Sequence, residues 1–234
     1  MDVTSEMISI PTPAGQMPAL RAMPTGAQGL PAVIVVQEAF GLNDHIKGVA
    51  KRLAAEGYVT LAPDLYYRGG AGRTAGYAEL PKAIEMMTTL KDPEIIEDIA
   101  AAVAYLEKDP AARGDRIGIT GFCMGGRVSY LAACALGDKI KAAVPFYGGG
   151  IPVERTDGLK CQVLALFGEE DPYIPLTQVA HLRAEASRLG KRVDVVVYPK
   201  APHGFFCDER DSYRPEAAAD AWKRTKAFLA QHLA

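Results

Sequence analysis

The chain of 234 residues is long enough for one large domain with a substantial core, and its 49% hydrophobic and 23% charged content is ordinary for globular proteins. Its formal net charge of −2 argues against nucleic acid or an anionic membrane surface as a partner. No apolar run reaches membrane-spanning length, and the first residues lack the pattern of a signal peptide. Four cysteines without a C-x-x-C motif fit free thiols in a reducing cytoplasm, where we expect this protein.

After an opening pair of antiparallel strands, the expected elements alternate between strand and helix. The pair covers residues 7–10 and 17–22, around a turn rich in proline and glycine. Further strands are expected at 32–36, 58–62, 116–120, 140–146, 162–167 and 193–198. Helices are expected at 43–56, from 92 onward, from 124 onward, at 175–189 and at 215–232. This alternation predicts a single α/β domain over residues 1–234, with a mostly parallel, doubly wound sheet flanked by helices.

The sequence makes specific predictions for two helix ends and for one stretch without a clear pattern. Gly57 is a good residue to end the first crossover helix, and Asp92 followed by Pro93 is expected to cap the start of the next. The stretch 66–82 has the least pattern of the whole chain. Because it follows the carboxyl end of a strand, it is either a substrate lid or a plain surface loop.

The most informative motif is Gly121-Phe122-Cys123-Met124-Gly125-Gly126, which directly follows the apolar strand 116–120. It has the G-x-nucleophile-x-G pattern of the α/β-hydrolase elbow, with cysteine in place of the usual serine. Such a strand-to-helix turn strains its central residue, lifts that side chain to the edge of the sheet, and needs small neighbours where the backbones cross. It also points the first amides of the next helix at whatever the side chain attacks. Alone, the motif fits an ordinary glycine turn with a buried thiol equally well.

An acid and a base follow the nucleophile in the order that this fold requires. Asp171 follows the strand 162–167, and His203 follows the strand 193–198. Singly, His203 is compatible with an ordinary loop histidine and Asp171 with a helix cap. Together with Cys123 at three successive strand ends, they predict a triad in which the imidazole takes the thiol proton and the carboxylate fixes the imidazole tautomer.

The remaining histidines and cysteines fit packing or surface positions. His181 and His232 lie in helical patterns, and His45 is expected to be a capping or surface group at the start of the first crossover helix. Cys134 and Cys161 are expected to pack in the interior. Because no metal-binding motif and no phosphate loop is present, we expect neither a metal nor a cofactor.

These motifs resemble the dienelactone hydrolase family, the carboxymethylenebutenolidases, which have the α/β-hydrolase fold. Cysteine at the elbow, together with Gln37-Glu38 at the end of the first parallel strand, makes the resemblance specific. The resemblance implies that Cys123, His203 and Asp171 form the catalytic triad. The matching stretches run over almost the whole chain, at 35–43, 62–66, 121–126, 146–148, 168–171 and 201–205.

The resemblance also implies roles that the residue pattern alone does not give. It implies an oxyanion hole formed by the amides of Met124 and Ala39. In the family, the glutamate at the position of Glu38 holds the resting thiol and takes its proton when substrate arrives; the alternative is a structural carboxylate that bonds nearby amides. The candidate substrate-binding residues are Phe40, Tyr147, Phe205 and Arg73.

One departure from the family pattern concerns the substrate carboxylate. Family members that act on dienelactone hold this group with two arginines, of which one lies four residues after the catalytic histidine. This chain has Cys207 at that position. The second arginine lies in the lid, where Arg68, Arg73 and Lys82 are loose candidates.

A cysteine nucleophile narrows the expected reaction. A thiolate attacks carbonyls well but is also expelled ahead of an ordinary alkoxide, which favours enol esters, lactones, thioesters and aryl esters. We therefore predict a cofactor-independent hydrolase that cleaves a small-molecule lactone or activated carboxylic ester through a thioester acyl-enzyme, acting as a monomer or a homodimer.

Two alternatives remain. Within enzymes, the alternative is a general carboxylesterase or thioesterase. In a different class, the alternative is a non-catalytic ligand-binding protein or a thiol redox sensor of the same fold. A full triad disfavours the ligand-binding protein, and only Cys207 could serve a sensor as resolving cysteine.

Overall fold

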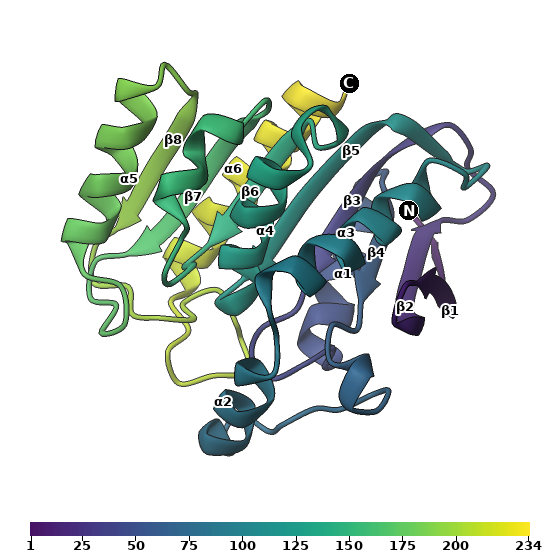
Figure 1. Ribbon diagram of the computed structural model, residues 1–234, viewed down its shortest axis with the longest axis horizontal. Helices are drawn as coiled ribbons and strands as arrows, with labels where there is room; N and C mark the ends of the chain where they lie inside the picture. The colour runs from purple at the N-terminus through teal and green to yellow at the C-terminus, as the bar shows by residue number, and fades with distance from the viewer. The chain divides into compact units, whose positions relative to one another are not determined.

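The computed structural model describes all residues from 1 to 234, and their contacts group into two compact units. The first unit is Met1–Ile119 and the second is Thr120–Ala234. In Figure 1 the first unit runs from purple to teal and the second from teal to yellow. The expected single domain over the whole chain stays a prediction.

Four strands of the first unit pair in the order β1-β2-β4-β3. The first two form the expected antiparallel hairpin, β2 also pairs antiparallel with β4, and β4 pairs parallel with β3. Every residue of β4 is buried, as are the last five of β3, which explains why β3 is apolar throughout and why β4 has Thr60 as its single polar residue. The bounds are β1 (Val3–Thr12), β2 (Gly15–Pro24), β3 (Leu30–Val36) and β4 (Val59–Pro63).

The helix α1 (Asp44–Ala55) begins and ends as the sequence predicts. The Asn43 side chain accepts a hydrogen bond from the amide of Ile46 at 3.1 Å and so caps the helix start. Beyond its end, Gly57 has a φ of 100°, which a residue with a Cβ adopts at a cost.

The start of α3 (Asp92–Leu106) corrects one expectation. The N-cap is Lys91, whose side chain makes no capping bond, and Asp92 is instead the first helical residue, followed by Pro93. Pro93 is tolerated there because the first-turn amides have no intrahelical acceptor, so its missing N–H costs no hydrogen bond. Asp92 is favoured there because the helix dipole stabilises a negative charge at the N-terminus.

The unpatterned stretch 66–82 contains more regular structure than we expected. It includes the short 3₁₀ turn η1 (Tyr67–Gly69) and the beginning of α2 (Leu80–Thr88). Only Ala83 and Met86 of α2 are buried, so its apolar period is too short to recognise in the sequence.

The second unit contains three strands that pair in parallel in the order β6-β7-β8. The long strand β5 continues into it from the first unit. Figure 1 shows α4 and α5 on one face of these strands and α6 on the other. The bounds are β5 (Ala112–Phe122), α4 (Met124–Ala135), β6 (Ala142–Phe146), β7 (Gln162–Gly168), α5 (Leu176–Arg188), β8 (Val193–Tyr198) and α6 (Pro215–Leu233), with 3₁₀ turns η2 (Gly137–Lys139) and η3 (Val153–Gly158).

Parallel pairing in the second unit determines where its loops meet. The carboxyl ends of β7 and β8 lie at the same edge, and Asp171 and His203 follow these two ends. Cys123 directly follows β5 and precedes α4. No helix of the chain combines the length and the apolar character needed to cross a membrane.

Candidate active site

The turn between β5 and α4 has the strained geometry expected of an elbow. Cys123 has a φ of 55° and a ψ of −118°, a region that residues other than glycine rarely adopt. Its amide donates to the carbonyl oxygen of Phe146 at 3.1 Å, and its own carbonyl accepts from the amide of Gly126 at 2.9 Å. A Cβ at Gly121 would collide with the carbonyl of Gly125. The glycines therefore permit the close crossing that the motif predicts.

His203 and Asp171 form a buried pair beside this turn. The distance between His203 Nδ1 and Asp171 Oδ2 is 2.7 Å, and the two residues are 8% and 7% exposed. The second carboxylate oxygen, Oδ1, accepts from the amide of Tyr173 at 2.9 Å. Because both oxygens are engaged, the carboxylate holds one orientation toward the imidazole.

The Cys123 side chain hydrogen-bonds the same imidazole, and this strongly affects its titration. Burial lowers the pKa of His203, but hydrogen bonds with Asp171 and Cys123, together with electrostatic interactions with both groups, outweigh it and raise the pKa from 6.5 to about 9. The imidazole is therefore protonated at neutral pH while it has these partners. Such an arrangement can hold a thiolate–imidazolium pair, in which the sulfur is the reactive nucleophile.

Two aromatic rings contact the His203 imidazole. The Tyr147 ring centroid lies 5.1 Å away and that of Tyr173 5.2 Å away. Tyr147 is fully buried with a φ of 35°, and Phe205, also buried, packs against it at 5.3 Å. Of the expected substrate-binding residues, Tyr147 therefore contacts His203, and Phe205 packs behind Tyr147 in the interior.

Tyr173 was not predicted from the sequence, although it is 63% exposed and contacts the imidazole. The available signal was its place two residues after Asp171, between Pro172 and Pro175. Surface aromatics in loops have no periodicity that would distinguish them.

Met124 follows the nucleophile as the first residue of α4. The amides of a first helical turn lack intrahelical acceptors and carry the positive end of the helix dipole. This position suits an amide that stabilises negative charge developing near Cys123.

The other predicted site residues lie in the first unit. Glu38 is completely buried, and its Oε2 accepts from the Tyr77 hydroxyl at 3.4 Å. The carbonyl of Ala39 accepts from the Tyr66 hydroxyl at 2.8 Å, and the Phe40 ring lies 4.8 Å from the ring of Tyr77. The roles of Glu38, Ala39 and Phe40 toward Cys123 stay predictions.

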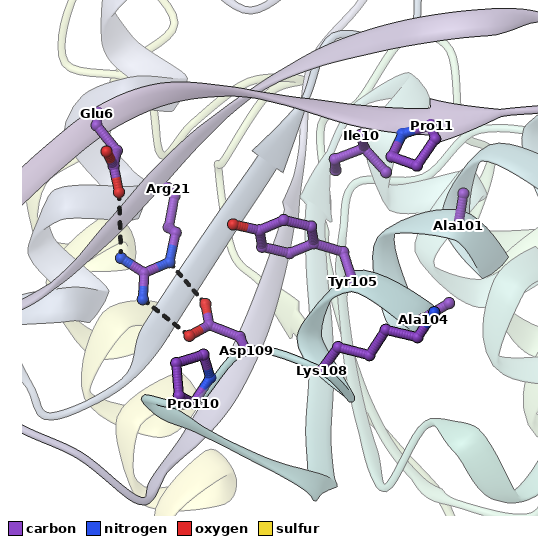
Figure 2. A pocket seen from close by; sticks show the side chains of 10 residues that line it. All are labelled: Glu6, Ile10, Pro11, Arg21, Ala101, Ala104, Tyr105, Lys108, Asp109 and Pro110. Atoms are coloured by element: carbon purple, nitrogen blue, oxygen red, sulfur yellow. Dashed lines mark hydrogen bonds and ion pairs between the residues drawn. The ribbon is translucent and has the colours of Figure 1, made fainter.

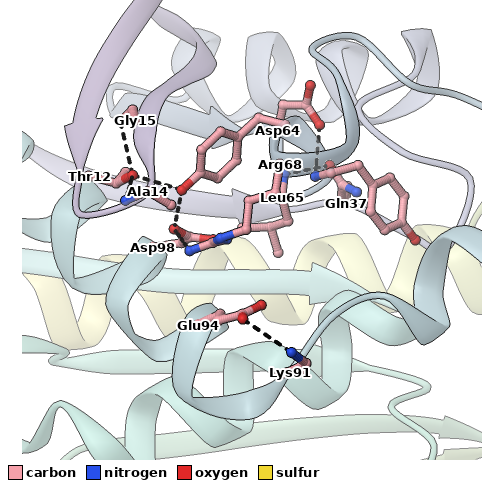
Figure 3. Close-up of polar contacts among 12 residues, drawn as sticks. Thr12, Ala14, Gly15, Gln37, Asp64, Leu65, Arg68, Lys91, Glu94 and Asp98 are labelled. Atoms are coloured by element: carbon pink, nitrogen blue, oxygen red, sulfur yellow. Dashed lines mark hydrogen bonds and ion pairs between the residues drawn. The ribbon is translucent and has the colours of Figure 1, made fainter.

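Buried carboxylates hold the loop that follows β4 (Figure 3). Asp64 accepts from the amides of Tyr66 at 3.0 Å and Gly72 at 2.7 Å, which closes the loop into a compact turn. Burial raises the pKa of Asp64 above its ordinary value even though these amides stabilise its charge. Asp98 on α3 receives two hydrogen bonds from the Arg68 guanidinium, so this arginine anchors the loop to the helix.

The three candidate cations after β4 differ in how far they already interact with a carboxylate. Arg68 is paired with Asp98, and Lys82 lies 3.7 Å from Glu79 on the surface. Arg73 lies against the backbone of Gly69, and its charge acts to lower the pKa of Asp64. The amide of Ala75 donates to the carbonyl of Phe40 at 3.1 Å and ties this part of the loop to the loop after β3.

The remaining histidines and cysteines mostly match expectation, with one correction. His45 is neither the cap nor a surface group: it is 5% exposed, because Asn43 caps α1 and the helix buries the face that carries His45. His181 is exposed, and His232 is half-buried against Phe228. Cys134, Cys161 and Cys207 are buried free thiols, and burial is the main factor that raises the pKa of the first two to about 12.

A separate cavity of about 580 Å³ lies in the first unit (Figure 2). None of the predicted site residues lines it. Its Arg21 and Asp109 are already paired by two hydrogen bonds, at 2.6 and 2.9 Å, so they satisfy each other rather than a ligand. No group of three or more histidine, cysteine, aspartate or glutamate side chains is arranged to hold a metal ion.

Comparison with known proteins identifies the family. The sequence matches the profile of the Dienelactone hydrolase family over residues 17–233. This chain belongs to that family. A Synechocystis sp. relative, provisionally named carboxymethylenebutenolidase, is 37% identical over 247 aligned residues that cover 100% of this chain and 99% of the relative.

Solved structures agree with this placement in the dienelactone hydrolase family. A provisionally named dienelactone hydrolase from Klebsiella pneumoniae subsp. pneumoniae superposes with a TM-score of 0.92 at 34% identity, covering 99% of this chain and 100% of its own. A dienelactone hydrolase-like promiscuous phosphotriesterase from metagenomic libraries superposes over both full chains with a TM-score of 0.89 at 25% identity. The predicted α/β-hydrolase fold is confirmed, and the protein is a hydrolase that acts on lactone or ester bonds.

Proposed function

We propose that this dienelactone hydrolase family member cleaves a lactone or an activated, enol-type carboxylic ester through a thioester acyl-enzyme on Cys123. One observation carries the proposal: the Cys123 side chain at a strained elbow hydrogen-bonds an imidazole whose other nitrogen lies 2.7 Å from Asp171. The nucleophile, the base and the group that orients the base are thus in contact in one unit.

Acylation begins when Glu38, in its proposed role, accepts the Cys123 thiol proton and leaves a thiolate beside the His203 imidazolium. Its sulfur adds to the substrate carbonyl carbon, and the carbonyl oxygen takes the negative charge. The Met124 amide, with that of Ala39 as its proposed partner, donates to this oxygen; an oxyanion donor of this kind is worth roughly 3–4 kcal/mol. The intermediate collapses to a thioester as the His203 imidazolium protonates the leaving oxygen.

Deacylation returns the enzyme to its starting state. The imidazole, now neutral, takes a proton from water, which attacks the thioester carbonyl. Collapse of the second intermediate releases the carboxylic acid and expels the thiolate, which takes its proton back from Glu38. Asp171 keeps the tautomer of His203 that serves both steps, and its charge stabilises the imidazolium each time it forms.

The cysteine nucleophile supports a substrate with a good leaving group. A thiolate is expelled ahead of an ordinary alkoxide, whereas an enolate or phenolate leaves readily. An enol released from a lactone also converts to its ketone, which removes the product that would reverse acylation. These features favour enol lactones and aryl esters over simple alkyl esters.

Binding of a substrate carboxylate requires a cation. Cys207 is fully buried and cannot supply the cation that family members place at its position. Arg68 and Lys82 are already in ion pairs with Asp98 and Glu79, so Arg73 is the residue that we assign to this contact. Glu38 is assigned the role of accepting the thiol proton when substrate arrives, which places a buried carboxylate at the end of β3 in the catalytic cycle.

Steady-state hydrolysis of an aryl ester and of an enol lactone tests the proposal. Cys123→Ala should abolish both activities without loss of fold, because the elbow accommodates a smaller side chain. Cys161→Ala, which alters a buried thiol outside the site, should retain both. Retention of more than a few per cent of wild-type turnover by Cys123→Ala would overturn the proposal.

A further inference from the structure

Tyr173 combines two properties that no other residue of the second unit shares. It is the only aromatic residue among the large hydrophobic side chains that are exposed, with 63% of its surface accessible. Its ring also contacts the His203 imidazole, with the centroids 5.2 Å apart and the planes at 90°. A large apolar surface is therefore in contact with solvent directly beside the proposed base.

Core packing does not explain the position of this ring, because the ring is mostly exposed and its hydroxyl has no hydrogen-bond partner. Its backbone is held instead. The Tyr173 amide donates to Asp171 Oδ1 at 2.9 Å, the next residue, Ile174, is 1% exposed, and prolines occupy positions 172 and 175. The turn that carries the catalytic acid thus fixes the Tyr173 ring against the imidazole and leaves its remaining surface accessible.

The chemistry of His203 identifies the part of a substrate that would cover this surface. The imidazolium gives its proton to the leaving oxygen, so the substrate atoms beside it belong to the alcohol or enol half of the ester. Tyr173 borders the same imidazole. A flat, aromatic leaving group can stack or pack edge-to-face against an aromatic ring and gain an interaction beyond simple apolar burial, which a saturated leaving group does not gain.

We propose that Tyr173 is a substrate-contact residue that gives the enzyme a preference for planar, aromatic or conjugated leaving groups. The inference rests on the function proposed above and adds to it a determinant of substrate class. With an open-chain ester the leaving group departs on acylation, so with such a substrate the contact acts on acylation and not on breakdown of the acyl-enzyme.

Two activated esters with the same acyl group, phenyl acetate and hexafluoroisopropyl acetate, test this preference. Both have a good leaving group, but only the phenyl group is flat and aromatic. Each variant is compared with wild type on each ester, so that the intrinsic difference in reactivity cancels. Tyr173→Ala should lower kcat/KM for phenyl acetate by about 10-fold, the order expected for loss of one aromatic contact, and for hexafluoroisopropyl acetate by less than about 3-fold. Tyr173→Phe should stay within about 2-fold of wild type, because the hydroxyl has no partner.

A matched control variant and the rate of acyl-enzyme breakdown distinguish two roles for Tyr173: contact with the substrate and positioning of His203. Leu176→Ala removes another exposed hydrophobic side chain, 47% accessible, that follows the same turn, and should leave both esters unaffected. The acyl-enzyme formed from phenyl acetate should break down in Tyr173→Ala at the wild-type rate with an unchanged pH profile. Slower breakdown would show that Tyr173 positions His203 and would overturn the proposal, as would equal losses on the two esters or no loss on either.

Failure of this inference is distinguishable from failure of the proposed function. If Cys123→Ala is inactive and Tyr173→Ala behaves as wild type on both esters, only the role of Tyr173 is wrong. If Cys123→Ala hydrolyses both esters, the proposed function is wrong and the inference about Tyr173 falls with it.

Discussion

Asp171 has two tasks at the scale of single residues. One carboxylate oxygen orients the His203 imidazole, and the other holds the backbone of Tyr173. The sequence predicts the first task, because an acid after β7 and a histidine after β8 follow the order of a triad. It cannot predict the second, since an amide–carboxylate bond across one turn leaves no pattern in residue type.

The charge of Asp171 should be essential to the rate. Asp171→Asn keeps the shape of the side chain but removes the charge that stabilises the imidazolium, and it permits the wrong tautomer. We expect kcat/KM for an aryl ester to fall roughly 10²–10⁴-fold, as for impaired general acid–base catalysis. Asp138→Asn, an exposed acid-to-amide change, should have no effect. Normal turnover in Asp171→Asn would remove Asp171 from the triad.

The raised pKa of His203 should also appear in the pH dependence of stability. Because its folded pKa of about 9 lies above the ordinary 6.5, protonated His203 stabilises the fold; this contribution is fully present below pH 6.5 and is lost as the pH rises through about 9. Urea unfolding of wild type and His203→Gln measures it. The stability difference in favour of wild type should shrink between about pH 6 and about pH 10. A stability difference between the two proteins that is constant over this pH range would contradict the raised pKa of His203.

At the scale of elements, long apolar runs and helical periodicity predict most of the fold. The strands β3 and β4 and the helices α1 and α3 carry these signals strongly. The sequence did not predict the helix α2, because only two of its residues are buried and they give too short an apolar pattern. The sequence also did not predict that His45 is buried. Its burial depends on which face of α1 packs inward, and a single histidine near a helix start does not indicate that face.

The crossing of α4 over the end of β6 depends on one glycine. A Cβ at Gly126 would collide with the carbonyl of Phe146, the same group that accepts the Cys123 amide. We expect Gly126→Ala to lower the free energy of unfolding by about 1–3 kcal/mol and to lower activity sharply. Gly48→Ala, in the open surroundings of α1, should instead raise stability by roughly 0.5–1 kcal/mol. Equal effects of the two changes on chemical denaturation would refute the steric account of the elbow.

The loop after β4 should owe its order to the buried Asp98 carboxylate, which receives hydrogen bonds from Arg68 and Tyr67. Asp98→Ala leaves a partly buried guanidinium without its partner, at a cost on the order of 3 kcal/mol. Lys82→Ala breaks a surface pair with Glu79 and should leave the unfolding midpoint unchanged. Proteolysis within 66–79 should accelerate only in Asp98→Ala; protection equal to wild type would mean that other contacts order this loop.

On the scale of the whole molecule, family membership and local geometry support different parts of the account. The profile match and full-length relatives establish a dienelactone hydrolase family member with the α/β-hydrolase fold. Contacts in the second unit support the assignment of Cys123, His203 and Asp171. The residues proposed to determine substrate class, Arg73 and Tyr173, lie in loops, where sequence periodicity gives no signal.

The central claim, a thioester acyl-enzyme on Cys123, is tested most directly by mass spectrometry of enzyme quenched during turnover of an aryl ester. The account predicts an acyl mass increment on the peptide that contains Cys123 in wild type and Cys161→Ala, and none in Cys123→Ala. His203→Ala, which cannot activate water for deacylation, should retain any adduct for longer. Continued hydrolysis by Cys123→Ala, or an acyl group found only on another residue, would contradict the account.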